Sequence, residues 1–269
     1  MNHPLNIYRR LISVQIRSQM QYRASFVLEI FTTGLITLLE YAALALIFYR
    51  FQSLKGWTLG EVAFLYGLAE TAFGVMDMVF SGFDPQHFGL EVRRGTLDQL
   101  LLRPLNITLQ VMGSEFILRR IGKIAVGIFI FFTALTLTEV HWTIAKIAYL
   151  PVVITGMTCF FGGLFIVGAT ITFWTVESIE AINIFTYGGS FMISYPMHIY
   201  MDWLRKLFTF IIPAAFLNYY PALYFLDKPD PFGLPPFAPF LSPLAGFGVL
   251  LAALAFWRFG IRNYQSTGT

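Results

Sequence analysis

The recurrence of long apolar runs constrains this chain more than any other feature of its sequence. Runs of about 20 mostly apolar residues recur along the whole length, and a helix of that size crosses a hydrocarbon layer roughly 30 Å thick. Hydrophobic residues make up 57% of the 269 positions and charged residues only 12%, which is more apolar side chain than one soluble core can hide. We therefore predict an all-helical integral membrane protein.

The spacing of the apolar runs predicts six transmembrane helices in a single domain that spans residues 1–269. The predicted crossings cover residues 24–49, 58–81, 109–137, 144–174, 181–194 and 241–257. The connection between the first two is short, so we expect them to form an antiparallel hairpin.

Two segments outside these crossings have patterns of their own. Residues 1–23 carry an apolar helical stripe opposite Arg10 and Arg17, which is typical of a helix lying in the membrane surface. A flexible polar terminus is the alternative. Residues 195–239 contain eight prolines and only short apolar runs, so we expect re-entrant or extracellular helices there instead of a further crossing.

The distribution of basic residues predicts the orientation of the chain. If the N-terminus is inside, twelve of the eighteen lysines and arginines fall in cytoplasmic segments and six in outer ones. Positive charge is concentrated on the cytoplasmic side of membrane proteins, and the densest cluster here lies between the second and third crossings. We therefore expect a multi-pass protein of the cytoplasmic (inner) membrane with both termini in the cytoplasm.

That basic cluster contains a segment, residues 84–104, with the signals of two short helices. Asp84 is suited to cap the first helix, Pro85 suits its first position, and Gly95 suits a left-handed end. A second helix follows, for which Thr96 and Gln99 have the spacing of a capping box, and it ends at a proline.

This second helix is predicted to be amphipathic. Its apolar side consists of Leu97, Leu100 and Leu101, and the charges around it are Arg93, Arg94, Asp98 and Arg103. A rigid helix of this kind on the cytoplasmic face suits the docking of a separate motor protein, since force must pass through a packed and charge-matched contact. The alternative is a basic loop that lies on anionic lipid headgroups.

The sequence of this segment resembles that of a known family. Residues 91–104 read E-V-R-R-G-T-L-D-Q-L-L-L-R-P, which resembles the signature E-x-R-x-G-T-L-D-x-L-L-x-R-P after the second span in one six-span branch of type 2 ABC exporter permeases. The residues that the resemblance assigns to coupling with an ATPase are Glu91, Arg93, Arg94, Gly95, Thr96, Leu97, Asp98, Leu100, Leu101, Arg103 and Pro104.

The resemblance implies a permease subunit that exports a hydrophobic or amphipathic compound, such as a drug, a lipid or a natural product. It also implies two copies of a separate ABC ATPase and a second permease subunit, identical or paralogous. The chain has no phosphate-binding loop of the form G-x-x-x-x-G-K-S/T, so ATP and Mg are expected on the partner, with no cofactor on this chain. By itself the chain is then not an enzyme.

Three carboxylates fall inside the predicted crossings, namely Glu40, Glu70 and Asp77. A carboxylate that faces lipid costs at least about 2.5–3.5 kcal/mol, so we expect these groups to face a helix interface or a wet cavity. No lysine or arginine is expected deep enough to pair with them. They line a translocation path, or they hold helices and subunits together by hydrogen bonds.

Other chemistry has little support. The four histidines lie on different predicted segments without the spacing of metal ligands, so no metal site is expected. The basic residues gather near membrane interfaces, so nucleic acid is not an expected partner. Two alternatives remain: a membrane-embedded enzyme or lipid-modifying protein that uses Glu40 and Glu70, and a secondary transporter independent of ATP, although no inverted repeat is visible.

Overall fold

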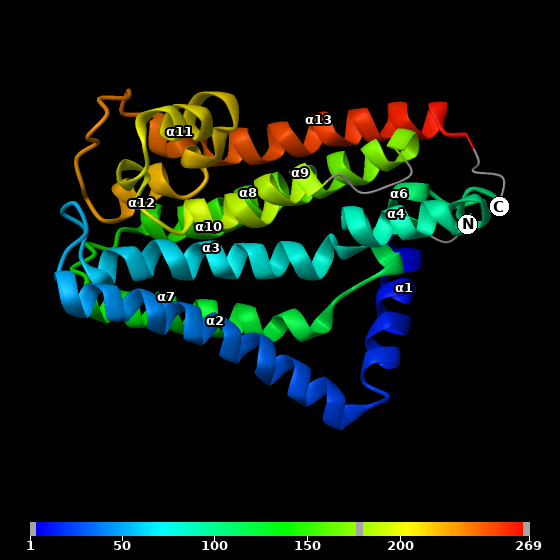
Figure 1. Ribbon diagram of the computed structural model, residues 1–269, viewed down its shortest axis with the longest axis horizontal. Helices are drawn as coiled ribbons and strands as arrows, with labels where there is room; N and C mark the ends of the chain where they lie inside the picture. The colour runs from blue at the N-terminus through cyan, green and yellow to red at the C-terminus, as the bar shows by residue number, and fades with distance from the viewer. Residues whose placement is uncertain (1–3, 176–179, 266–269) are drawn as a thin grey trace.

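The computed structural model describes residues 4–175 and 180–265, and within these ranges the chain is built from helices (Figure 1). Among the described residues, five helical stretches are long and apolar enough to cross a membrane. They are α2 (Arg23–Phe51), α3 (Leu59–Val79), a 3-10 turn with α7 (Leu118–Leu137), α8 (Ile144–Thr175) and a 3-10 turn with α13 (Ala238–Asn263). The prediction of an all-helical, multi-span membrane protein is confirmed.

Helix α3 lies at the centre of the molecule. Inside its apolar stretch 83% of the residues are buried, against 17% for α2, so α3 is enclosed by protein while α2 presents most of its side chains outward. Helices α7 and α8 pack on α3, and α13 packs along α8. Small residues allow this close contact, since a Cβ on Gly246 of α13 would lie 2.1 Å from the carbonyl oxygen of Gly156 in α8.

The third predicted crossing, residues 109–137, is interrupted in the structure. Helix α6 (Ile107–Ser114) ends early, Glu115 is extended with φ −137° and ψ 132°, and the chain becomes helical again in a 3-10 turn (Leu118–Arg120) followed by α7 (Ile121–Leu137). The long helix expected over these residues is therefore two helices joined by an extended segment.

The fifth predicted crossing, residues 181–194, is a shorter helix. It comprises α9 (Glu180–Asn183), a π-helical turn (Ile184–Gly188) and α10 (Gly189–Ile193). These 14 residues rise roughly 21 Å, less than the thickness of a hydrocarbon layer of roughly 30 Å. The helix stops just before Pro196.

Short helices follow in residues 195–241. They are a 3-10 turn (Met197–Ile199), α11 (Asp202–Lys206), a π-helical turn (Leu207–Ile211), a 3-10 turn (Pro213–Phe216), α12 (Tyr219–Phe225) and a 3-10 turn (Ala238–Leu241) that leads into α13 (Ser242–Asn263). The stretches Asp202–Ile211 and Pro213–Phe225 meet at 71°. Pro213 stands at this bend, where it cannot supply the amide that a continuous helix needs.

The elements divide between two ends of the molecule (Figure 1). Helices α1 (Pro4–Gln19), α4 (Pro85–Arg93) and α6 lie at one end together with the last turns of α13, and α1 runs crosswise to the long helices. The bent helices α11 and α12 lie at the opposite end, near the turn between α2 and α3. All of the docking segment predicted from the sequence therefore shares one end with α1.

Candidate functional site

The predicted helix caps of the docking segment are present. One carboxylate oxygen of Asp84 accepts hydrogen bonds from the backbone amides of Gln86 and His87, each at 3.0 Å, and Pro85 occupies the first turn of α4. Gly95 has φ +69°, a left-handed conformation that favours glycine, and separates α4 from α5 (Thr96–Leu101). These local predictions are confirmed.

The predicted capping box of α5 is wrong. The residue that precedes the helix is Gly95, which has no side chain to act as a cap, and the Thr96 hydroxyl donates to the carbonyl oxygen of Glu91 at 2.8 Å. Thr96 therefore ties α5 back onto α4. The tight glycine turn brings the end of α4 within reach of that hydroxyl, which sequence spacing alone does not reveal.

The leucines of α5 do not share one outward face. Leu97 is 1% exposed and belongs to the core, and Leu100 is half-buried against it. Leu101 is 40% exposed, and Leu102, directly after the helix, is 86% exposed. The apolar surface open to a partner is thus formed by Leu101 and Leu102 with Leu105 beside them, and exposed Arg93, Arg94 and Arg103 lie around it.

Leu102 was absent from the predicted docking residues. It is the last of three consecutive leucines, and helical periodicity directed attention to the positions before it. Glu91, Asp98 and Pro104, which the resemblance also assigns to coupling, lie in the same segment; Glu91 and Asp98 are partly buried and Pro104 is exposed.

Aromatic packing anchors the docking segment to the long helices. Phe88 of α4 packs against Phe173 of α8 and Trp257 of α13, with ring centroids 5.6 Å and 5.4 Å away. The indole of Trp257 donates to the hydroxyl of Thr108 in α6 at 3.1 Å, and the Gln110 amide donates to the carbonyl oxygens of Leu100 and Leu105. A push on α4 and α5 is therefore passed to α8 and α13 through packed contacts.

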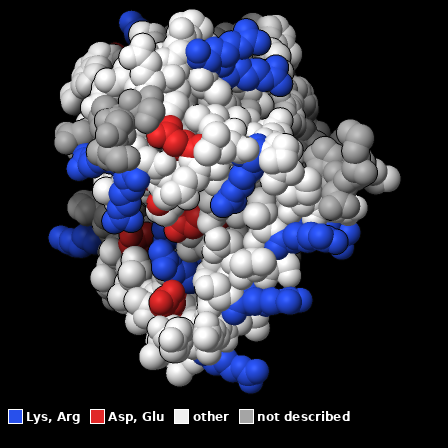
Figure 2. Space-filling view, turned by 90° about the vertical axis from the view of Figure 1, so that its right-hand side faces the viewer, with Lys and Arg blue, Asp and Glu red and all other residues white. Residues whose placement is uncertain are grey.

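Seen end-on, this side of the molecule is rich in basic side chains. Figure 2 shows Lys and Arg spread over much of the face, with a smaller group of Asp and Glu between them. A basic face of this kind is what the positive-inside pattern places next to the cytoplasm.

Two of the three interior carboxylates are paired with cations, contrary to expectation. Glu70 lies 2.8 Å from the Lys123 amine, and Asp77 lies 2.7 Å from the Arg120 guanidinium. Both carboxylates are buried in α3. The expectation that no cation reaches them is wrong because the chain crosses to α3 at the extended segment before α7, which brings Arg120 and Lys123 alongside its last turns.

Glu40 has a different environment. It lies half-buried on α2 and accepts a hydrogen bond from the Tyr66 hydroxyl of α3 at 3.2 Å. The structure therefore brings Glu70 and Asp77 into one helix contact, between α3 and the start of α7, and places Glu40 apart from them on an outward-facing helix.

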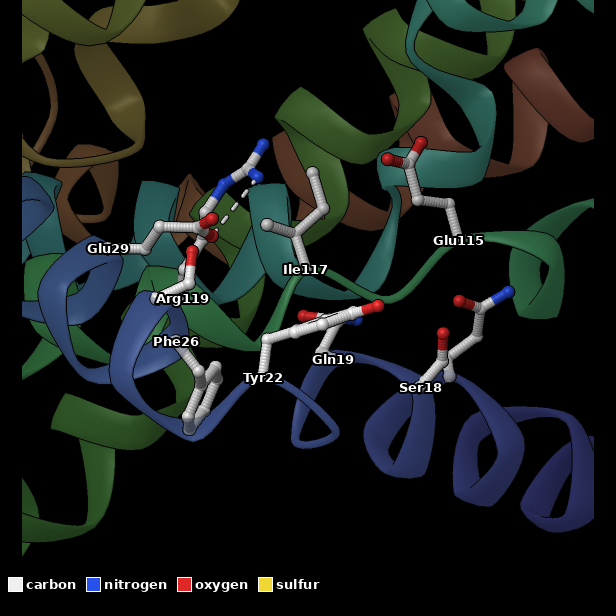
Figure 3. Close-up of a pocket in the computed structure, with 10 residues that line it drawn as sticks. Ser18, Gln19, Tyr22, Phe26, Glu29, Glu115, Ile117 and Arg119 are labelled. Carbon is white, nitrogen blue, oxygen red and sulfur yellow. Dashed lines mark ion pairs between the residues drawn. The ribbon is translucent and has the colours of Figure 1, made fainter.

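A polar pocket lies where α1, α2 and residues 115–119 meet, and Figure 3 shows its lining. Its volume is about 310 Å³. Glu29 and Arg119 stand at one side and Glu115 at the other, with Tyr22 and Ile117 between them (Figure 3). The remaining lining residues are Gln15, Ser18, Gln19, Ser25 and Phe26. The sequence pattern did not indicate this site.

Side chains of α1 complete the backbone hydrogen bonds of the extended segment beside the pocket. The Gln19 side chain donates to the carbonyl oxygen of Phe116 and accepts from the amide of Leu118 at 3.0 Å, and the Gln15 amide donates to the carbonyl oxygen of Ser114. Backbone groups that have left a helix need such partners when they are shielded from water. The elbow between α1 and α2 is thereby fixed to the interruption in the third crossing.

Charges in and beside the pocket are unevenly distributed. Arg119 lies 3.5 Å from Glu29, and the His87 ring of α4 lies 3.5 Å from Glu115. Burial raises the pKa of the Glu115 carboxyl above its ordinary value, and the nearby His87 opposes that rise. Asp84 and Asp77 raise the same pKa further, while Arg119 lowers it.

Among the described residues, no group of three or more His, Cys, Asp or Glu side chains is arranged to hold a metal ion. The features that stand out are the docking segment, the buried ion pairs and the polar pocket.

Comparison with known proteins agrees with this set of features. The model of the ABC-2 family transporter proteins matches residues 35–268, which is most of the chain and includes the docking segment, α3 and the start of α7. No curated protein and no solved structure matches the chain. The multi-span helical fold and the extent of the match lead to the same conclusion: this chain belongs to the ABC-2 family of transporter membrane proteins.

Proposed function

We propose that the chain is the permease subunit of an exporter that moves a hydrophobic or amphipathic compound across the cytoplasmic membrane. Membrane components of ABC-2 transporters are typically non-catalytic transport subunits, and the family implies an ATPase partner. The observation that carries our proposal is the surface of α4 and α5, where exposed Leu101 and Leu102 are ringed by arginines on a segment anchored to α8 and α13.

The orientation we propose has both termini in the cytoplasm. Its support is the basic face shown in Figure 2, which carries α1, α4 and the end of α13. The docking surface then faces the compartment that holds ATP, and the bent helices α11 and α12 face outward.

The assembly we propose contains two ATPase chains, which bind ATP and Mg, and a second permease subunit. Two features support it: the loop sequence of residues 91–104, and the mostly unburied apolar surface of α2, which suits either lipid or a second membrane subunit. A partner that is identical and one that is paralogous are equally compatible with that surface.

We further propose different roles for the interior carboxylates. Glu70 and Asp77 hold α3 against the start of α7, because each is buried in a close ion pair. Glu40 lies on the outward-facing α2, and we assign it to the translocation path.

Substitution of the exposed leucines tests the docking proposal. We expect Leu102→Asp, and the double variant with Leu101→Asp, to abolish co-purification of the ATPase with the tagged permease in mild detergent. A carboxylate placed in an apolar contact loses its hydration without gaining a partner, which costs several kcal/mol by itself, at least about 2. Quantitative mass spectrometry of the co-purified proteins measures the loss.

The matched control is Leu137→Asp, which places the same charge on an exposed leucine at the end of α7. It should insert and retain the ATPase. If the complex survived Leu101→Asp with Leu102→Asp intact, docking through this surface would be wrong.

A further inference from the structure

The polar pocket at the elbow of α1 and α2 has the character of a headgroup site. Resting on the proposed export function, we propose that it binds the ammonium end of a long-chain amphiphile, with Glu115 and Glu29 facing the positive charge (Figure 3). The proposal narrows the cargo or lipid recognised by this chain to a class: single-headed amphiphiles with a cationic, hydrogen-bond-donating headgroup.

The size of the pocket suits a headgroup. Its volume of about 310 Å³ lies at the small end of ligand pockets, which range over roughly 300–1,000 Å³. Five of its lining side chains are neutral and hydrogen-bonding: Gln15, Ser18, Gln19, Tyr22 and Ser25. Such a lining accommodates a small polar group and leaves a long alkyl chain outside.

The charge of the pocket favours a cation. Two carboxylates and one guanidinium line it, and Arg119 is already 3.5 Å from Glu29. Glu115 faces the His87 ring at 3.5 Å, and its side chain is only 30% exposed. A charge that is partly shielded from water interacts more strongly with an ion beside it than an exposed charge does. An ammonium group is thus the ion that this lining stabilises.

The position of the pocket accounts for the alkyl chain. Tyr22, Phe26 and Glu29 follow the helical spacing of one face of α2, and that face continues through Ile36 to Glu40. Ile36 is 52% exposed, and α2 diverges from α7 toward its N-terminal end (Figure 1). A chain that leaves the pocket therefore has an open apolar helix surface to lie against within the bilayer.

The pocket also adjoins the docking segment. His87, which contacts Glu115, belongs to α4, and the carbonyl oxygen of Glu115 accepts from the Ser81 hydroxyl at the end of α3 at 3.2 Å. An ammonium that engages Glu115 competes with His87 for the same carboxylate. The headgroup site and the ATPase-docking surface thus share an element.

Binding to the full-length chain, purified alone in phosphatidylcholine nanodiscs, tests the proposal. The probes are dodecylamine and dodecanol, which share an alkyl chain and differ in headgroup charge, and empty nanodiscs give the background. We expect the wild-type chain to bind dodecylamine about tenfold more tightly than dodecanol, the difference expected for one charged hydrogen bond. Glu115→Gln should remove that preference and leave dodecanol binding unchanged.

Two further variants guard the interpretation. Glu29→Gln should weaken dodecylamine binding in the same direction, and it reports on the site if Glu115→Gln fails to fold. Glu139→Gln removes one exposed carboxylate from the connection between α7 and α8, at the other end of the molecule, and should bind as the wild type does. Equal binding of the two probes by the wild type, or an unchanged preference in both Glu115→Gln and Glu29→Gln, would overturn the proposal.

The source of the ammonium is settled by the lipid. If phosphatidylethanolamine in the nanodisc displaces dodecylamine from the wild type, the occupant is a bilayer lipid; if it does not, the site selects a transported amphiphile. Both results support the site. Because no ATPase is present in the assay, a failure here leaves the docking proposal standing, and loss of ATPase co-purification leaves amine binding to be judged separately.

Discussion

Paired charges between α3 and the start of α7 are the strongest residue-scale feature inside the bilayer-spanning part. Glu70 with Lys123 and Asp77 with Arg120 are 2.8 Å and 2.7 Å apart, and Lys123 also lies 4.9 Å from the ring centre of Phe73. Removing one member of a buried pair leaves an uncompensated charge, which is far more costly than replacing both members by neutral groups.

For the pair of Glu70 and Lys123 we expect strong coupling. Glu70→Gln or Lys123→Met alone should each destabilise the protein by about 3–5 kcal/mol, and the double variant should recover a large part of that loss. Thermal unfolding in mild detergent, followed by the loss of monodisperse protein, measures the three variants against the wild type. Additive losses in the double variant would show that the two side chains do not stabilise each other.

Local signals made part of the residue-scale structure predictable. Asp84, Pro85 and Gly95 act within a few residues of themselves, so the sequence correctly predicted how α4 begins and ends. The depth of Lys123 was not predictable, because it depends on how α7 is offset along α3, and α3 is more than forty residues earlier in the chain.

At the scale of elements, close helix contact sets the position of α3. A Cβ on Gly67 would lie 2.6 Å from the backbone nitrogen of Phe131 in α7, and one on Gly127 would lie 2.8 Å from the Thr71 hydroxyl. Backbone atoms cannot rotate aside as a side chain does. The contact of α3 with α7 thus needs glycine on both helices, and that contact keeps the buried ion pairs in register.

A pair of glycine substitutions tests this contact. We expect Gly67→Ala to lower the thermal midpoint because overpacking costs about 1–3 kcal/mol. Gly248→Ala is the matched control on α13, where a Cβ would meet no described atom within 4 Å, and it should be neutral or stabilising by up to about 1 kcal/mol. Equal midpoints for the two variants would contradict tight packing at Gly67.

Element lengths were predictable from apolar runs only where a helix is continuous. Residues 144–174 were expected as one crossing and α8 covers Ile144–Thr175, with the sequence supplying no polar interruption. The interruption at Glu115 was missed because residues 107–114 are helical and apolar themselves, so the break depends on partners from α1 and α3, namely Gln19 and Met78.

At the scale of the whole molecule, the two ends differ in chemistry. One end carries α1, α4, α5 and the basic face of Figure 2, and the other carries the proline-rich bent helices. This asymmetry underlies the proposed orientation, because lysines and arginines are retained on the cytoplasmic side of a membrane.

Cysteine labelling in intact cells tests the orientation. The chain has a single cysteine, Cys159, which is buried and is replaced by alanine as background. We expect Ser53→Cys, in the exposed turn after α2, to react with a membrane-impermeant thiol reagent added outside. Arg103→Cys, beside the docking surface, should react only after the membrane is permeabilised. The reverse pattern would place the docking surface outside and end the coupling proposal.

The sequence alone determined the solvent of this protein, its helical class, the caps of α4 and the family resemblance of the loop, because apolar length and local turn residues act over short stretches of chain. Only the tertiary structure decided which leucines face outward, which cations reach Glu70 and Asp77, and where the polar pocket forms. Those outcomes depend on the rotation and offset of helices far apart in sequence, which are set by packing between them.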